Sequence, residues 1–569
     1  MKKFTNEKNA LILLSLFKQA GIRYIIASPG NTNSAFIGSA QNDPYFKIIS
    51  VVDERSAAYV AIGYCLKLNE PIVISCTGAT ASRNYMPALT EAFYRRLPII
   101  AVTSSQRLSR AGHLHAQFID RTQVPKDVVK ASHILPIVKD QDDYWHCEIE
   151  ANRALAHVLC ADKGPIHINL PTTFEKPFNT NSIPVAKYIK VIDCTKDYPS
   201  IKGKIAIFIG SISYLNDEVT KKIENFSKKY NAPVFVDHTS NYRGLNAINL
   251  SLLGAQDGVN KSFFKPDVMI HIGEITGDYY TLNFGGRETW RVSHDGQVID
   301  TFKSLKYVFK SSLVDFFSIY TSKSNKDNSS DYLYQIKEAV DNVHNNVPEL
   351  PFSNMSIAKY LSEELTGPWN VHLAILNSLR VWNFFRVSDY IKISSNVGGF
   401  GIDGPLSTAM GEASAIPEVP HLTVVGDLAF FYDINILGNK NIPNNMCVIL
   451  INNGEGFEFK QFNHHAAMFG QSVENFISAS GHNGQKSKSL VKGFAESLSF
   501  DYFSANDSDE FKAVFTKFIE THDQRKTIIE CFVESSRENE ALRLISNITS
   551  NKGYIAKKGM KNIVKKIIR

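Results

Sequence analysis

The chain has 569 residues, of which 44% are hydrophobic and 21% charged, and its formal net charge is +6. This composition excludes an intrinsically disordered protein, and the length suggests about three or four domains. The excess of positive charge is small for this length, so we expect no nucleic-acid partner.

The cysteines and the N-terminus give expectations about the compartment. The seven cysteines form no CxxC pair, which favours a reduced, cytoplasmic protein over a disulfide framework. The first residues combine two lysines with a short apolar run at helical spacing, so we expect a helix and no signal peptide. No apolar run reaches the roughly 18 residues that cross a membrane.

Short apolar runs alternate with helical patterns along the chain. In the first part we expect a buried helix over 56–67 and strands at 24–27, 48–52, 71–76, 97–103 and 164–171. After a linker over 172–200, a second unit has expected strands at 204–211, 234–236, 268–272 and 304–308. A third has them at 371–373, 391–394, 422–425, 447–451 and 527–532. Such alternation predicts parallel sheets with helices on both faces.

The expected fold is therefore α/β, with three doubly wound, Rossmann-like domains. We place them at 1–185, 195–335 and 350–550, followed by a basic tail at 551–569. The tail is interpreted as solvated, and contact with an anionic membrane surface is the alternative.

The clearest chemical pattern lies in the third unit. Asp427 follows one expected strand, and Asn453 follows the next. Because parallel strands end at a common edge, the carboxylate, the amide oxygen and a loop carbonyl would hold Mg²⁺ there, with phosphate oxygens and water completing its shell. The alternative is that Asp427 caps a helix and the asparagines form a turn.

A second pattern lies in the first unit, where Glu54 ends an expected strand and precedes a helix rich in small residues. Glu54 either stabilises the helix N-terminus or hydrogen-bonds a heterocycle from a buried position.

Eight segments, spread over nearly the whole chain, carry a family resemblance. They are SPGNTNSAF (28–36), VDERSAAYVAIG (52–63), TGATASRNYMPAL (77–89), GPIHINLP (164–171), NSL (377–379), SSNVGGFGIDGPLSTAMG (394–411), VVGDLAFFYDIN (424–435) and INNGEGFEF (451–459). They resemble the thiamin diphosphate (ThDP) enzymes of the pyruvate decarboxylase and acetolactate synthase superfamily. Within it, the nearest resemblance is to the menaquinone-pathway SEPHCHC synthase.

The resemblance implies roles for individual residues. Glu54 would bond N1′ of the cofactor's aminopyrimidine, and Ile402 would support the bent cofactor. Asp427 and Asn453 would ligate Mg²⁺ through their side chains and Glu455 through its carbonyl, although the Asp–Asn spacing is one residue shorter than in relatives. The other positions that match cofactor contacts are Pro29, Gly30, Thr77, Gly78, Ser378, Gly401, Gly426 and Leu428.

The resemblance also places candidates for the reaction pocket. Gln117 matches a pocket glutamine, and the nearby histidines that could shuttle protons are His113, His115, His464 and His465. The pattern around each histidine alone favours a surface or supporting position, with one of the four as a proton shuttle. In the family the site is shared between subunits, so we expect a homodimer at least, and a dimer of dimers. The stretch after Gly210 lacks a GxGxxG fingerprint, so we expect no FAD.

The chain departs from SEPHCHC synthase in the substrate pocket. That enzyme binds 2-oxoglutarate and isochorismate with arginines and a lysine, where this chain has Thr32, Trp382, Val397 and the pair Asp278-Tyr279. Trp382 and Val397 suggest a less anionic acceptor, or one with an aromatic or sugar face. The cations that could compensate are Arg83, Arg107, Arg380 and Lys460.

We therefore expect a ThDP- and Mg²⁺-dependent enzyme that decarboxylates a 2-oxo acid and transfers the acyl anion to a carbonyl or enone acceptor. A nucleotide-linked keto sugar is one hypothesis for that acceptor. The enzymatic alternatives are a simple decarboxylase that releases an aldehyde and SEPHCHC synthase with an altered pocket. A non-catalytic descendant and a membrane scaffold are the alternatives of another class.

Overall fold

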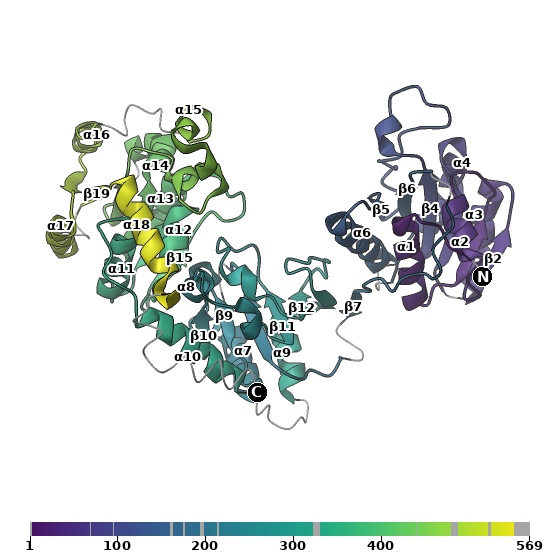
Figure 1. Ribbon diagram of the computed structural model, residues 1–569, viewed down its shortest axis with the longest axis horizontal. Helices are drawn as coiled ribbons and strands as arrows, with labels where there is room; N and C mark the ends of the chain where they lie inside the picture. Colours follow the sequence, from purple (N-terminus) through teal and green to yellow (C-terminus); the bar gives the residue numbers. More distant parts are fainter. Residues whose placement is uncertain are drawn as a thin grey trace. The chain divides into compact units, whose positions relative to one another are not determined.

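The computed structural model describes residues 3–68, 70–94, 96–159, 163–174, 177–193, 198–212, 215–322, 331–440, 442–478, 487–521 and 525–550. The basic tail, Cys160 and Cys194 lie outside these residues. The described chain forms three parallel β-sheets with accompanying helices, so the expected α/β class is confirmed (Figure 1). It divides into two compact units, Met1–Pro199 with Glu288–Ser312 and Ser200–Arg287 with Leu313–Arg569.

The first sheet has the strand order β2-β1-β3-β4-β6-β5. Its strands are β1 (Tyr24–Ala27), β2 (Lys47–Ser50), β3 (Ile72–Thr77), β4 (Ile99–Ser105), β5 (Ala131–Ile134) and β6 (Ile166–Pro171). Neighbouring strand residues point to opposite faces, so that Ile25 and Ile26 belong to two separate hydrophobic cores. The helices around this sheet are α1 (Lys8–Gln19), α2 (Ser34–Ala40), α3 (Glu54–Leu68), α4 (Ala79–Asn84), α5 (Met86–Tyr94) and α6 (Gln141–Leu159).

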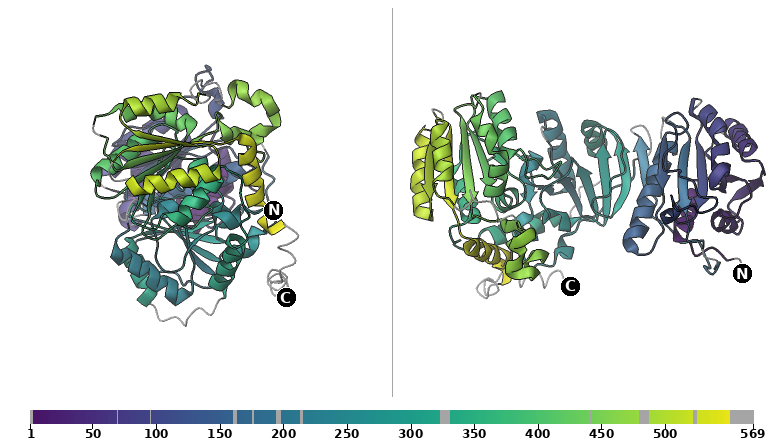
Figure 2. Two further views of the ribbon diagram at one scale, coloured as in Figure 1. Left: turned by 90° about the vertical axis from the view of Figure 1, so that its left-hand side faces the viewer. Right: turned by 90° about the horizontal axis from the view of Figure 1, so that it is seen from above.

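The third sheet has the order β15-β14-β16-β17-β19-β18. Its strands are β14 (Asn370–Leu373), β15 (Lys392–Ser394), β16 (His421–Gly426), β17 (Met446–Asn452), β18 (Asp501–Ala505) and β19 (Thr527–Phe532). Numbered within each sheet, both orders read 2-1-3-4-6-5, so the first and third sheets share one topology. Helices lie on both faces of the third sheet (Figure 2). They include α11 (Asn354–Glu364), α12 (Asn377–Trp382), α13 (Pro405–Ala415), α14 (Asp427–Asp433), α15 (Val473–Phe476), α16 (Leu490–Ser497), α17 (Ser508–Thr521) and α18 (Ser535–Ser546).

The middle sheet has seven strands. Its strands β10-β9-β8-β11 lie in the second unit and β12-β13-β7 in the first. They are β7 (Lys190–Asp193), β8 (Ile205–Ile209), β9 (Val234–Val236), β10 (Ala247–Asn249), β11 (Val268–Ile272), β12 (Glu288–Ser293) and β13 (Leu305–Lys310). The remaining helices are α7 (Asp217–Tyr230), α8 (Ser251–Gly254), α9 (Leu313–Ser322) and α10 (Tyr332–His344).

Two expectations about the first 200 residues can be compared with the structure. The expected N-terminal helix is α1. The expected linker over 172–200 is wrong in part, because Lys190–Asp193 forms β7 and pairs with β13.

No helix of the described residues is long and apolar enough to cross a membrane. The five described cysteines, Cys65, Cys76, Cys147, Cys447 and Cys531, are buried free thiols.

Candidate active site

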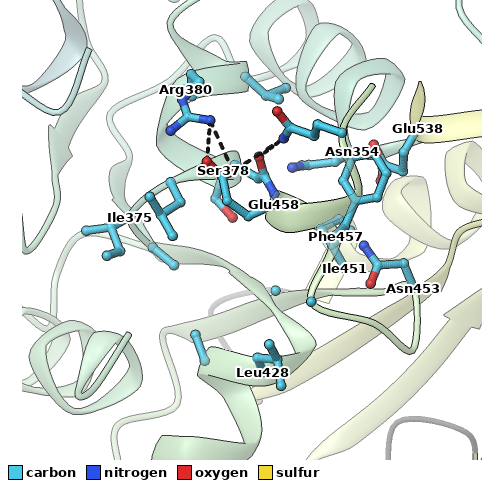
Figure 3. A pocket seen from close by; sticks show the side chains of 18 of the residues that line it. Asn354, Ile375, Ser378, Arg380, Leu428, Ile451, Asn453, Phe457, Glu458 and Glu538 are labelled. Atoms are coloured by element: carbon cyan, nitrogen blue, oxygen red, sulfur yellow. Dashed lines mark hydrogen bonds and ion pairs between the residues drawn. The ribbon is translucent and has the colours of Figure 1, made fainter. Parts of the chain in front are cut away.

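A pocket opens at the carboxyl ends of β14, β16 and β17, where it is lined by Ala374, Gly426 and Asn453 (Figure 3). Strand β14 lies between β15 and β16, so the chain connections leave it in opposite directions. Parallel sheets bind ligands at such a switch point, because the loops on either side diverge and leave a crevice.

Asp427 is the most perturbed group in this pocket. Its side chain is buried, and its carboxylate accepts hydrogen bonds from the backbone N–H groups of Leu428 at 2.8 Å and Gly454 at 2.7 Å. Burial raises the pKa of Asp427 to about 7, and the described groups that oppose this rise are backbone N–H groups. A buried carboxylate without a cationic side chain against it suits a hard divalent cation.

The loop after β17 supplies the other oxygens of the predicted metal site. Asn453 lines the pocket, and its Oδ1 accepts from the N–H of Glu455 at 3.1 Å. The Glu455 carboxylate contacts Lys460 at 2.7 Å and Ser535 at 3.0 Å. The carbonyl of Glu455 accepts a hydrogen bond from the N–H of Phe457 at 3.0 Å, and its second lone pair is the one that a cation could use. The carboxylate, amide and carbonyl oxygens fit Mg²⁺ carrying a diphosphate.

The structure brings many of the predicted cofactor residues together. The pocket is lined by Ser378, Ile402, Gly426, Asp427, Leu428, Asn453 and Glu455.

A simple helix cap, the alternative role for Asp427, does not account for all of its contacts. Asp427 is the first residue of α14, yet its carboxylate also bonds Gly454 across the neighbouring strand end.

Sequence reasoning missed Glu538 in the same pocket. This carboxylate on α18 is 5% exposed and accepts a hydrogen bond from the N–H of Asn354 at 3.0 Å. Burial raises its pKa to about 7, and the charge of Asp427 contributes to the rise. No local pattern could have found Glu538, because it reaches the pocket from a helix more than one hundred residues beyond Asp427.

In the first unit, the two acidic residues at the start of α3 make different contacts. Asp53 caps the helix, since its Oδ1 accepts from the N–H of Ser56 at 2.7 Å, and this bond lowers the pKa of Asp53. Glu54 is half-buried and accepts from Nδ2 of Asn84 at 3.3 Å. Asp53 thus makes the capping hydrogen bond, while Glu54 lies in the first turn of α3, where its charge also favours the helix N-terminus.

The other cofactor residues of the first unit lie at the carboxyl edge of the first sheet. Pro29 and Gly30 follow β1, and Thr77 and Gly78 lie at the end of β3. A Cβ on Gly30 would lie 1.7 Å from Cγ2 of Thr77, so only glycine allows this approach of the two strand ends.

Among the described residues that line the pocket, none is a histidine predicted to shuttle protons, and Gln117 is not among them either. His113, His115 and Gln117 are exposed in the loop after β4, and Gln117 has a left-handed φ of 59°. Nδ1 of His464 accepts from the N–H of Ala466 at 3.1 Å, and its ring stacks on His465 with centroids 4.5 Å apart. Their roles in proton transfer stay predictions.

Most of the residues at the family's cationic positions are buried or bonded to groups that do not line the pocket. Trp382 and Val397 are 0% and 5% exposed and do not line the pocket, so they carry no information about the acceptor. Asp278 is buried and accepts from Ser251 at 2.5 Å. The hydroxyl of Thr32 donates to the carbonyl of Ser104 at 2.9 Å.

Comparisons with known proteins agree with this geometry. Residues 8–124 match the family model "Thiamine pyrophosphate enzyme, N-terminal TPP binding domain". The chain is 28% identical over 572 residues to the 2-succinyl-5-enolpyruvyl-6-hydroxy-3-cyclohexene-1-carboxylate synthase of Phocaeicola vulgatus, covering 95% of this chain and 98% of that protein. It is 30% identical over 477 residues to the protein of the same name from Flavobacterium johnsoniae, covering 79% and 83%.

Parallel sheets with a pocket at a switch point define a class of α/β proteins that bind ligands at the carboxyl ends of their strands. Within that class, the chain belongs to the family of thiamine pyrophosphate enzymes that contains these synthases.

Proposed function

We propose that the protein is a ThDP- and Mg²⁺-dependent enzyme that decarboxylates a 2-oxo acid and joins the resulting acyl anion equivalent to a second substrate. The observation that carries the proposal is the buried carboxylate of Asp427 beside Asn453, at the switch point of the third sheet. Bound ThDP would supply the carbanion chemistry through which the 2-oxo acid loses CO₂.

The residues of the chain would bind and orient that cofactor. Asp427, Asn453 and the carbonyl of Glu455 would hold Mg²⁺ and, through it, the diphosphate. Ile402 and Leu428 line the same pocket and would exclude water from it with apolar surface. Glu54 would hydrogen-bond the aminopyrimidine ring, and Gln117 and the four histidines remain candidates for moving protons.

The acceptor is the less supported half of the proposal. The names of the relatives favour a SEPHCHC synthase reaction, while the missing family cations favour a different substrate pair. A simple decarboxylase would use the same pocket without an acceptor. The keto-sugar hypothesis finds no support in any described residue. We further propose the domain limits 1–185, 195–335 and 350–550 and a site shared between two subunits in the cytoplasm.

The exchange of the C2 proton of ThDP in D₂O tests the role of Glu54 directly. With Mg²⁺ present, we expect Glu54→Gln to slow this exchange by about 100-fold or more, as is typical when an acid–base group is lost. Asp53→Asn, which changes the neighbouring cap, should leave the rate close to that of the wild type. Equal rates in the wild type and Glu54→Gln would contradict the proposal.

A further inference from the structure

Arg121 is a buried cation in the first unit, and the proposed cofactor site does not use it. The residue is 5% exposed, and its Nη2 donates to Oδ1 of Asn169 at 2.8 Å. Its Nη1 has no hydrogen-bond partner among the described residues, and none of their carboxylates forms an ion pair with it. A charge taken out of water is costly unless an opposite charge or several hydrogen bonds compensate it. The buried Nη1 therefore calls for a partner that these residues do not supply.

The titratable groups around Arg121 carry positive charge or none. Burial, and less strongly the charge of Arg83, lowers the pKa of Arg121 to about 10, so Arg121 stays a cation at neutral pH. Burial raises the pKa of the Cys76 thiol to about 12 and lowers the pKa of His167 to about 3. Both groups are therefore neutral at physiological pH, and neither balances the charge of Arg121.

The carboxylate next to Arg121 in the chain is engaged at the surface. Asp120 is exposed, and its Oδ1 accepts from the N–H and the hydroxyl of Thr122 at 2.9 and 2.7 Å. These bonds and the charge of Arg83 lower the pKa of Asp120. Asp120 thus acts with groups at the surface and not with the buried guanidinium.

A small cavity lies against Arg121 and Arg83, which both line it. Its volume is about 20 Å³, enough for one particle of about the size of a water molecule. The rest of its described lining contains no aspartate or glutamate and includes the apolar residues Met86, Leu89, Ala101 and Val124. Apolar walls strengthen the attraction between a guanidinium and an anion, because they keep water away from the charges. The cavity therefore suits one small anion and is too small for a sulfate, a phosphate or an organic acid.

The two arginines come from segments that meet at the carboxyl edge of the first sheet. Arg121 lies in the loop between β4 and β5, and a Cβ on Gly78 would lie 3.5 Å from its Cζ. Arg83 lies on α4 beside Asn84, whose Nδ2 donates to Glu54. An anion between the two guanidinium groups would therefore join this loop to the helix that contacts Glu54.

We propose that Arg121 and Arg83 bind one monovalent anion of the size of chloride in this cavity. The anion supplies the counter-charge that the buried guanidinium lacks, and it stabilises the folded first unit. The alternative is a water molecule, which would hydrogen-bond Nη1 and leave the charge uncompensated. The inference goes beyond the proposed function and does not rest on it, because neither arginine lines the pocket at Asp427.

Melting temperatures of the full chain in sodium chloride and in sodium gluconate, at equal ionic strength, test the proposal. Gluconate is too large for the cavity, so only chloride can fill it. At about 0.2 M, chloride in place of gluconate should raise the melting temperature of the wild type by about 2–4 °C more than that of Arg121→Met, because a ligand of the folded state stabilises it. In gluconate, Arg121→Met should melt at or above the wild-type temperature, since methionine there replaces an uncompensated charge.

Arg153→Met is the matched control for these measurements. Arg153 belongs to the same unit, is exposed and pairs with Glu150 at 2.7 Å. This variant should keep the full chloride response of the wild type. Arg83→Met removes the second guanidinium of the cavity, so a higher chloride concentration should be needed for half of the response.

A second measurement needs no variant, so it decides the question even if Arg121→Met does not fold. Bromide has the charge of chloride and can be located in crystals by its anomalous scattering. Wild-type crystals soaked in sodium bromide should show an anomalous peak within hydrogen-bond distance of Nη1 of Arg121. Equal chloride responses in the wild type and Arg121→Met would overturn the inference. So would crystals in which bromide occupies surface sites and water alone fills the cavity.

Discussion

At the scale of single residues, the candidate site contains buried carboxylates, and for Asp427 the described groups that stabilise its charge are backbone N–H groups. Burial still raises the pKa of Asp427 to about 7. Mg²⁺ would replace the missing counter-charge and favour the ionised form.

Asp427→Asn should therefore weaken Mg²⁺-dependent binding of ThDP by at least about 10- to 100-fold, the loss seen even when supporting groups of metal sites are removed. Calorimetric titration of ThDP at fixed Mg²⁺ measures this change. The control is Asp433→Asn on the same helix, since Asp433 is buried and accepts from the N–H of Ser407 at 2.7 Å but does not line the pocket. It should lower the melting temperature and leave ThDP affinity unchanged. Equal affinities in the wild type and Asp427→Asn would contradict the assignment.

Glu530 is a second buried carboxylate, and it contacts the residue that ends β17, next to the loop that carries Asn453. It accepts hydrogen bonds from Nδ2 of Asn452 and from the hydroxyl of Tyr502, both at 2.7 Å. Burial raises its pKa. A carboxyl group with a raised folded-state pKa favours the folded state at low pH, and this contribution is lost as the pH rises through that pKa.

Glu530→Gln removes the titrating proton and keeps an acceptor for Asn452. We expect the stability of this variant relative to the wild type to increase between pH 5 and pH 8, because only the wild type then ionises a buried group. Melting temperatures of both proteins across this range measure the effect. A difference between them that does not change with pH would show that Glu530 titrates normally.

At the scale of elements, the site depends on how the loop after β17 turns back toward β16. Gly454 has a φ of 70° and donates its N–H to Asp427, so a left-handed residue forms the link between the two strand ends. Any side chain at this position adds strain, because an L-residue in this conformation costs about 1–2 kcal/mol.

Gly454→Ala should destabilise the loop by about that amount and raise the Mg²⁺ concentration needed for ThDP binding. The change is read from Mg²⁺ titrations at fixed ThDP. Gly21→Ala offers a control, because Gly21 also has a positive φ, 79°, has open space for an added Cβ and does not line the pocket. It should lose similar stability without a change in the Mg²⁺ requirement. A parallel change in both variants would assign the effect to general destabilisation.

Some strands are easier to predict from the sequence than others, and their position in the sheets is the main reason. Interior strands such as β4, β8 and β17 are buried on both faces and form continuous apolar runs, so their approximate positions follow from the sequence. Four of the five missed strands, β5, β7, β10 and β18, lie at sheet edges, where polar residues are common and the apolar pattern is broken. The fifth, β12, is an interior strand whose apolar pattern is broken by its own polar residues, in the sequence ETWRVS.

The candidate site could be predicted only in part, and the part that could be predicted follows interior strands. Asp427 and Asn453 follow interior strands, and the rule for parallel sheets brings such strand ends together. The ion pair of Arg380 and Glu458, which both line the pocket, was not predictable, because 78 residues separate the partners and only the fold brings them into contact. Glu538 could not be predicted either, because only the folded structure brings it into the pocket.

At the scale of the whole molecule, the first and third sheets repeat one topology, and each has predicted cofactor residues at its carboxyl edge. The family resemblance implies that one cofactor is bound jointly by the edge with Glu54 in one subunit and the edge with Asp427 in another. The two halves of one site would then come from different chains.

Mixing two inactive variants tests this arrangement. Glu54→Gln and Asp427→Asn homodimers should each be inactive, while a heterodimer combines the two intact residues in one of its two sites. Random reassociation of equal amounts should therefore recover about one quarter of the wild-type activity. Refolding the variants together and separately, followed by the same assay, gives the comparison. No recovery from demonstrated heterodimers would place both residues of a site in one chain.

The central claim, that this protein decarboxylates a 2-oxo acid with ThDP, is tested most directly by CO₂ release. The wild type and Glu54→Gln would be assayed with ThDP, Mg²⁺ and a panel of 2-oxo acids that includes pyruvate and 2-oxoglutarate, with and without candidate acceptors. We predict release from at least one acid by the wild type and its loss in Glu54→Gln. Release that persists in Glu54→Gln, or a wild type that binds no ThDP and releases no CO₂, would contradict the claim.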